Sequence, residues 1–237
     1  MASAKIVRPA PHPESVSIAK PITVLLADDH VIVREGLRAL LTTDQPLQIL
    51  AEAGTGREAV EMAKTLRPDV VVMDIAMPAL NGLEATRQMH ADDPAVKVLI
   101  LSAYGDDAYV DRACAAGASG FLEKLTSAHN VIEGIHALAA GQPFFGRSIA
   151  GRRRASRDKS RDRNGLPREN AQSLTTREAE VLQLVAEGAT NKEIGAALKI
   201  SVKTVEKHRQ CVMDKLAIHN TAGLTRYAIA HGMIAFH

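Results

Sequence analysis

The chain carries several short apolar runs that end in an acidic or polar residue. The clearest is Val-Val-Val-Met at residues 70–73, which is followed directly by Asp74. An unbroken apolar run of this length is typical of a strand buried on both faces of a parallel sheet. Open sheets of this kind bind ligands beyond the carboxyl ends of their strands. Asp74 is therefore predicted to lie at a ligand site and not in a core.

A second run, at residues 22–27, ends before Asp28 and Asp29 and is predicted to bring both acids to the same edge as Asp74. Carboxylates that lie close together raise one another's pKa unless a cation compensates their charge. A divalent ion held by carboxylate and carbonyl oxygens is the usual compensation. We therefore expect Mg²⁺ at this edge.

Two later runs add a hydroxyl and an ammonium group to the predicted edge. Residues 96–101 precede Ser102, and residues 119–122 precede Glu123 and Lys124. Phosphoryl transfer uses a carboxylate nucleophile, a metal ion that neutralises charge, and donors that hold the phosphoryl oxygens. The sequence supplies these residue types, although an Asp or Ser at a strand end is also a common helix cap or turn former.

These residues resemble the receiver domain of two-component response regulators. The matching segments are, in chain order, Asp28-Asp29-His30, Asp74-Ile75-Ala76-Met77-Pro78, Asn81-Gly82-Leu83-Glu84, Ser102-Ala103 and Gly120-Phe121-Leu122-Glu123-Lys124. The resemblance implies that Asp74 accepts a phosphoryl group whose oxygens are held by Ser102 and Lys124. It also implies a Mg²⁺ site formed by Asp28, Asp29, Asp74 and the backbone carbonyl of Ala76.

The same resemblance implies a conformational switch formed by Ser102 and Phe121. In that family the hydroxyl moves toward the phosphate and the aromatic ring turns inward. Phe121 also suits the role of an ordinary core aromatic, and the two roles are compatible. Ala76 and Tyr104 stand two positions beyond Asp74 and Ser102, where the family tunes how fast the acyl phosphate hydrolyses.

The spacing of the runs predicts an alternation of strands and helices. Strands are expected near residues 22–27, 47–52, 69–74, 96–101 and 119–122, and helices start near residues 32, 56, 82, 107 and 127. Five such units predict a parallel sheet with helices on both faces. The receiver resemblance implies a flavodoxin-like, doubly wound, five-stranded parallel sheet of order 2-1-3-4-5, an order that the pattern alone leaves open.

Charge and composition divide the chain. Residues 22–141 have 9 Lys and Arg against 17 Asp and Glu, whereas residues 142–237 have 17 against 9. The acidic part suits Mg²⁺ and the basic part suits nucleic acid. The expected parts are a disordered N-terminal extension over residues 1–21, the receiver over 22–141, an Arg-rich basic linker over 142–173, and an all-α helix-turn-helix domain over 174–237. The linker is either a charged tether or a nonspecific DNA clamp.

Three helix starts are predicted in the C-terminal part. Thr175 is followed three residues later by Glu178, and Thr190 by Glu193, which are two capping-box patterns. Ser201 can cap a third helix, whose apolar and polar residues fall on opposite faces. A short helix, a tight turn and an amphipathic helix are typical of a helix-turn-helix, whose second helix enters the DNA major groove.

The segment 191–208 closely resembles the LuxR-type helix-turn-helix, and the whole chain resembles a NarL/FixJ-type response regulator. This resemblance implies DNA phosphate contacts for Lys192, Lys203 and Thr204, and base-edge contacts for Glu206, Lys207 and Gln210. An ordinary solvated helix surface is the plain alternative. Gly195 replaces a common alanine, at a cost of about 1 kcal/mol to its helix unless close packing requires glycine.

The last predicted helix places Leu224, Tyr227 and Ala228 near one face. The resemblance implies that this face contacts a second copy, so we expect a homodimer on DNA when the protein is phosphorylated. The simpler alternative is that these residues pack on their own domain.

The combined expectation is a DNA-binding transcriptional regulator, not an enzyme, that a sensor histidine kinase controls by Mg²⁺-dependent phosphorylation of Asp74. One alternative is a regulator that binds DNA constitutively and uses its receiver only as a docking surface. An aspartyl-phosphate enzyme is a second, but Ala76 stands where such an enzyme needs another acid. The chain has no apolar run that could span a bilayer and no signal-peptide core, so we expect a cytoplasmic location without a membrane partner.

Overall fold

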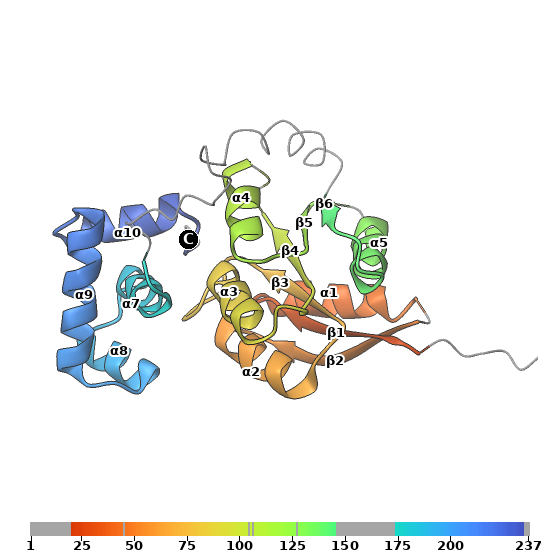
Figure 1. Cartoon of the computed structure of the whole chain (residues 1–237), viewed down its shortest axis with the longest axis horizontal. Coiled ribbons are helices and arrows are strands. Elements are labelled where there is room, and N and C mark those ends of the chain that lie inside the picture. The colour runs from red at the N-terminus through yellow and green to blue at the C-terminus, as the bar shows by residue number, and fades with distance from the viewer. Residues whose placement is uncertain are drawn as a thin grey trace, which may run out of the picture.

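The computed structural model describes residues 20–44, 46–103, 105, 107–126, 128–145 and 174–234. Tyr104, most of the predicted N-terminal extension and most of the predicted linker lie outside these residues. The described residues form an α/β unit and a helical unit that contact each other (Figure 1). No helix within them is long and apolar enough to cross a membrane.

The α/β unit alternates strands and helices along its whole length. Its elements are β1 (Ile22–Ala27), α1 (Val31–Leu41), β2 (Leu47–Ala53), α2 (Gly56–Leu66), β3 (Val70–Asp74), α3 (Gly82–Asp92), β4 (Val98–Ser102), α4 (Asp107–Ala115), β5 (Gly120–Glu123), α5 (Ala128–Ala139) and β6 (Phe144–Phe145). All neighbouring strands pair in parallel, in the order β2-β1-β3-β4-β5-β6. The predicted order of the first five strands is confirmed. The short sixth strand differs from the prediction, because it lies in the segment assigned to the linker.

Two apolar layers cover the two faces of this sheet. Successive residues of a strand point to opposite faces, and in β1 Leu25 joins a core with α2, α3 and α4. Val24 and Leu26 join the other core, to which α1 and α5 contribute. Because both faces are covered, the central strands need apolar residues at every position, which explains the unbroken runs in the sequence.

The helical unit consists of α7 (Thr176–Ala186), α8 (Asn191–Leu198), α9 (Val202–Leu216) and α10 (Thr221–Ala230). Both predicted capping boxes form, with Thr175 paired to Glu178 and Thr190 paired to Glu193. The side chain of Ser201 caps α9. These side chains satisfy backbone N–H groups that a helix start otherwise leaves unpaired, so the sequence sets where three of the four helices begin.

Gly195 lies inside α8, where the turn into α9 approaches closely. A β-carbon added at this position would lie 2.9 Å from the backbone carbonyl oxygen of Ile200. The amide of Ile200 also donates to the carbonyl oxygen of Gly195 at 2.9 Å. Close packing of the tight turn therefore accounts for the glycine, despite its low helix propensity.

Thr23 and Asp69 tie the starts of β1 and β3 together. Asp69 Oδ2 accepts from the Thr23 amide at 2.8 Å and from its hydroxyl at 2.6 Å. The Thr23 hydroxyl in turn accepts from the Asp69 amide at 2.9 Å. The bonds from Thr23 lower the pKa of Asp69 below its ordinary value, because they favour the ionised carboxylate.

We expect Asp69→Asn to lower the free energy of unfolding by about 1 kcal/mol at neutral pH, because the amide accepts the same bonds more weakly. Because the pKa of Asp69 is lowered in the folded protein, these bonds stabilise the folded state at a pH above the ordinary pKa of 3.8. The stabilisation is lost as the pH falls through the pKa of Asp69 in the folded protein. Urea unfolding across a pH series measures the difference, with Asp92→Asn at an exposed position as the control. A difference that stays constant into strong acid would contradict the assignment.

Candidate functional site

Four strands deliver the predicted site residues to one edge of the sheet. Asp28 follows β1, Asp74 ends β3, Ser102 ends β4 and Lys124 follows β5. The strands are parallel, so their carboxyl ends lie at the same edge. The side chains of Asp28 and Asp74 are 2% and 3% exposed. Carboxylates are almost never buried this deeply unless another group pairs with them.

The ammonium group of Lys124 lies between these two carboxylates. Its Nζ is 2.8 Å from Asp28 Oδ2 and 2.9 Å from Asp74 Oδ2. Burial by itself would lower the pKa of Lys124, but Asp74 and Asp28 outweigh it and raise the pKa. The lysine therefore stays charged and links the ends of β1, β3 and β5.

Asp74 carries a net electrostatic cost in spite of this lysine. Burial raises the pKa of Asp74, Lys124 lowers it, and the neighbouring charges of Asp28 and Asp29 raise it again. The net shift is upward, so one ammonium group does not compensate the acidic cluster. An additional positive charge would stabilise the ionised form.

The donor set at this edge fits a hard divalent cation. Side-chain ligand atoms that lie within 4.8 Å of one another come from Asp28, Asp29, His30 and Asp74. Two of the buried oxygens, Asp29 Oδ1 and Asp74 Oδ2, have no well-formed hydrogen bond among the described residues. A cation that accepts oxygen ligands would satisfy both, and Mg²⁺ prefers such ligands. His30 was not predicted as a ligand; its Nδ1 lies 2.7 Å from Asp29 Oδ1.

The loop from β3 to α3 packs tightly against Asp74. The Ile75 amide donates to Asp74 Oδ1 at 2.8 Å, and the Gly82 amide donates to the Ile75 carbonyl oxygen at 2.8 Å. A β-carbon at Gly82 would lie 1.8 Å from the Asp74 carbonyl oxygen, so only glycine permits this approach. Ala76, whose carbonyl the sequence predicts as a metal ligand, lies within this loop.

Ser102 ends β4, the strand beside that of Asp74, and Phe121 lies on β5, one strand further along the sheet. Ser102 is 1% exposed and immediately follows Leu101, the residue that pairs with Asp74 in the sheet. Phe121 is fully buried in the core formed with α2, α3 and α4. Phe121 is therefore a core aromatic in this conformation, and its switch role stays a prediction.

The predicted DNA-contacting residues lie on the surface of α8 and α9. All of them are exposed except Thr204, which is half-buried: Lys192, Lys203, Thr204, Glu206, Lys207 and Gln210. The opposite side of α9 carries Val205 and Val212, which are buried in the core of the helical unit. Figure 1 shows α9 on the side of that unit away from the sheet.

Comparisons with known proteins match both units. Residues 24–136 match the response regulator receiver domain, and residues 172–228 match the bacterial regulatory proteins of the luxR family. The transcriptional regulatory protein LiaR of Bacillus subtilis is 39% identical over 207 residues, which are 87% of this chain and 96% of LiaR. The response regulator protein VraR of Staphylococcus aureus is 35% identical over 213 residues, 90% of this chain and 99% of VraR.

The chain belongs to the two-component response regulators with a LuxR-type DNA-binding domain. A crystal structure of a LuxR-family two-component response regulator from Aurantimonas sp. SI85-9A1 is 34% identical, with a TM-score of 0.56. The match covers 59% of this chain and 100% of the Aurantimonas chain. The α/β unit is thus the receiver domain of a transcription regulator, and the helical unit is its DNA-binding domain.

The regulator does not present the predicted dimer face on α10. Leu224 and Ala228 are both 0% exposed within their own domain, and Leu224 packs in the core with α7 and α9. Neither side chain is accessible to a second copy in this conformation, and the predicted dimer contact stays a prediction. Tyr227 is half-buried and stacks on His231, with ring centroids 3.8 Å apart.

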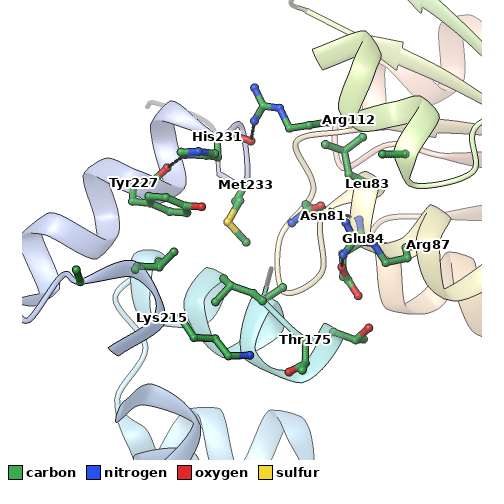
Figure 2. Close-up of a pocket in the computed structure, with 16 residues that line it drawn as sticks. Asn81, Leu83, Glu84, Arg87, Arg112, Thr175, Lys215, Tyr227, His231 and Met233 are labelled. Atoms are coloured by element: carbon green, nitrogen blue, oxygen red, sulfur yellow. Dashed lines mark hydrogen bonds and ion pairs between the residues drawn. The ribbon is translucent and has the colours of Figure 1, made fainter. Parts of the chain in front are cut away.

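The two domains of the regulator line an open pocket of about 860 Å³ between α3, α4, α7 and the end of α10. Figure 2 shows Tyr227, His231 and Met233 on one side and Asn81, Leu83 and Glu84 on the other. The Arg112 guanidinium bridges the two sides by donating to the His231 carbonyl oxygen. No pattern in the sequence indicated this docking, since the groups involved are common surface residues.

We expect Asp74→Asn to raise the free energy of unfolding by about 1 kcal/mol without divalent ions, equivalent to roughly 2–4 °C in melting temperature. The pKa of Asp74 is raised in the folded protein, so the Asp74 carboxyl stabilises the folded state at a pH below its ordinary pKa. This stabilisation is lost as the pH rises through the pKa of Asp74 in the folded protein. Calorimetry at neutral pH in the presence of a chelator measures the shift in melting temperature. Asp69→Asn is the control, because it should change stability in the opposite direction; a destabilised Asp74→Asn protein would refute the assignment.

Proposed function

We propose that Mg²⁺-dependent phosphorylation of Asp74 by a sensor histidine kinase controls how this regulator binds double-stranded DNA. The observation that carries the proposal is the Lys124 ammonium shared by two buried carboxylates, Asp28 and Asp74, within a larger acidic cluster. This arrangement combines a nucleophile with positive charge at the position where phosphoryl oxygens would lie.

In the proposed reaction, an oxygen of ionised Asp74 attacks the phosphorus of a phosphohistidine on the kinase. The new P–O bond forms as the P–N bond breaks, and the leaving imidazole takes up a proton. Lys124 and Ser102 hold the phosphoryl oxygens. Bound Mg²⁺, held by Asp28, Asp29, Asp74 and the Ala76 carbonyl, supplies the charge neutralisation that this transfer needs.

Exposed apolar side chains around the site support docking of a protein donor. Ile32, at the start of α1, is 84% exposed, and Leu125, directly after Lys124, is 94% exposed. Val31 is 55% exposed on the same helix. Large exposed apolar side chains that follow the site residues Asp29 and Lys124 closely in the chain suit a partner protein.

The exposed polar face of α9 supports the DNA-binding part of the proposal. Lys203 and Lys207 supply charge for phosphate contacts, while Glu206 and Gln210 offer hydrogen-bonding groups to base edges. Gln210 Nε2 donates to Asp214 Oδ1 at 2.8 Å, which orients its amide along the helix. Two phosphorylated copies would occupy adjacent half-sites as a homodimer, and Tyr227 would become available to the second copy only when the domains separate.

Phosphorylation is tested by the intact mass of the full chain after incubation with Mg²⁺ and a small acyl phosphate. We expect a gain of one phosphoryl group in the parent and none in Asp74→Ala, because the variant lacks the nucleophile. Leu125→Ser serves as a matched control: it should accept phosphate from the small donor but react more slowly with a kinase. No mass gain in the parent with either donor would favour a regulator that binds DNA constitutively.

DNA recognition is tested by two substitutions on α9. Lys203→Ala should weaken binding to specific and random DNA alike and reduce the salt dependence by about one phosphate contact. Gln210→Ala should cost about 1–3 kcal/mol at one base position and relax the preference there. Titrations against operator and random duplexes at several salt concentrations separate the two effects, and equal losses on both DNAs from both variants would refute this division of roles.

A further inference from the structure

Gln183 belongs to the first helix of the DNA-binding domain, α7, but its side chain is bound to the receiver. The residue is 0% exposed. Its Oε1 accepts from the Asn81 amide at 2.7 Å and from Asn81 Nδ2 at 3.0 Å. Its Nε2 donates to the Met77 carbonyl oxygen at 2.8 Å and to Glu187 Oε1 at 2.8 Å. The buried amide is thus fully engaged, and three of its four bonds go to one receiver loop.

That loop, residues 75–81, is also the loop that leaves Asp74. At its start, the Ile75 amide donates to Asp74 Oδ1. At its end, Asn81 caps α3 by accepting from the Glu84 amide at 3.0 Å. Ala76 lies between Ile75, which is bonded to Asp74, and Met77, which is bonded to Gln183. The acidic site and the DNA-binding domain therefore bind the same short segment.

Glu187, the capping residue directly after α7, also contacts the loop, at a residue in an unfavourable backbone conformation. Ala79 has a φ of 65°, in the left-handed region that residues with a β-carbon rarely adopt. Its amide donates to Glu187 Oε1 at 3.1 Å. Strained conformations persist only where the surroundings enforce them, and here part of the enforcement comes from the other domain.

Ala79 of the loop also packs against the apolar core of the DNA-binding domain. Among the described residues, the other polar contacts between the domains do not involve this loop. Arg57 on α2 lies 3.3 Å from Glu180 Oε1 of α7, and Gln88 on α3 donates to the same oxygen at 3.3 Å. Arg112 on α4 holds the His231 carbonyl oxygen. These contacts contribute to docking, but none of them is a contact with the segment around Ala76. Gln183 and Arg57 therefore provide a matched pair of positions that separates loop support from docking in general.

We propose that Gln183 is a positioning residue for the receiver's metal site: by holding residues 77–81, it keeps the Ala76 carbonyl where a divalent cation bound by Asp28, Asp29 and Asp74 can reach it. The inference rests on the proposed function, since it takes the acidic cluster as the cation site. A loop ordered in advance loses less conformational freedom on binding, so the docked domain raises the affinity for Mg²⁺.

This coupling acts in both directions. If docking raises Mg²⁺ affinity by some factor, then Mg²⁺ strengthens docking by the same factor, because binding free energies around a closed cycle must balance. The state of the acidic site is thereby transmitted to α7 through the loop. The exposed face of α9 takes no part in this contact, so the coupling does not require the receiver to cover the DNA-reading surface.

The experiment compares the full-length parent with Gln183→Met and Arg57→Ala. Methionine keeps the length of the side chain but removes all four hydrogen bonds, whereas Arg57→Ala weakens docking without touching the loop. Mg²⁺ alone is titrated, and the rise in melting temperature gives an apparent Kd. Burial raises the pKa of Glu187, in spite of the opposing bonds from Gln183 and Ala79, so all three proteins are compared in one buffer at one pH.

We expect Gln183→Met to raise the apparent Kd for Mg²⁺ about fivefold or more, the lower end of the usual coupling between sites. Arg57→Ala should leave it close to the parent value, because the contacts of Gln183 and Arg112 still hold the domains together. Hydrogen exchange in metal-free protein supplies a readout that does not depend on the cation. The amides of Ala79 and Asn81 should exchange faster in Gln183→Met and at the parent rate in Arg57→Ala.

Two results would overturn the inference while leaving the proposed function intact. One is an unchanged Mg²⁺ affinity in a folded Gln183→Met protein that still accepts a phosphoryl group on Asp74. The other is an equal loss of affinity in Gln183→Met and Arg57→Ala, which would assign the effect to docking in general. A parent that binds no Mg²⁺ would instead overturn both the inference and the metal-dependent part of the proposed function.

Discussion

The Lys124 ammonium between Asp28 and Asp74 is the interaction on which the acidic edge of the receiver depends. Two carboxylates buried this deeply repel each other and are costly to ionise. Lys124 reaches across the end of β4 from β5, so a single long side chain joins the ends of three strands. The pKa of Asp74 is still raised, which leaves the site short of positive charge and suited to a cation.

The receiver and the DNA-binding domain contact each other at the loop that follows Asp74. α7 and the end of α10 face the receiver, while α9 lies on the other side of its domain (Figure 1). Most of the residues predicted to contact DNA are therefore exposed while the domains are docked. A chemical change at Asp74 would reach the DNA-binding domain through α7, and the consequence for α9 would follow from the movement of a whole domain.

Much of the fold could be predicted from the sequence because its signals are local. Apolar runs end at the residues where the strands end, and Thr175, Thr190 and Ser201 mark helix starts through short-range hydrogen bonds. Predictions based on one helix face were weaker. Leu224 and Ala228 form an apolar stripe whether they meet their own domain or a second copy, and the pattern carries no information about which surface covers them. Gln183 gave no signal either, because a glutamine in a helix usually faces solvent.

By itself, the sequence determined the order of strands and helices along the chain, the acids at the strand ends, and the polar face of α9. Each of these depends on residues close together in the chain, where periodicity, capping and strand-end position act directly. Only the tertiary structure decided that Lys124 bridges Asp28 and Asp74, that Leu224 and Ala228 are core, and that Gln183 grips the loop after Asp74. These contacts join residues far apart in the sequence, and the packing of complete domains, which no local pattern encodes, brings them together.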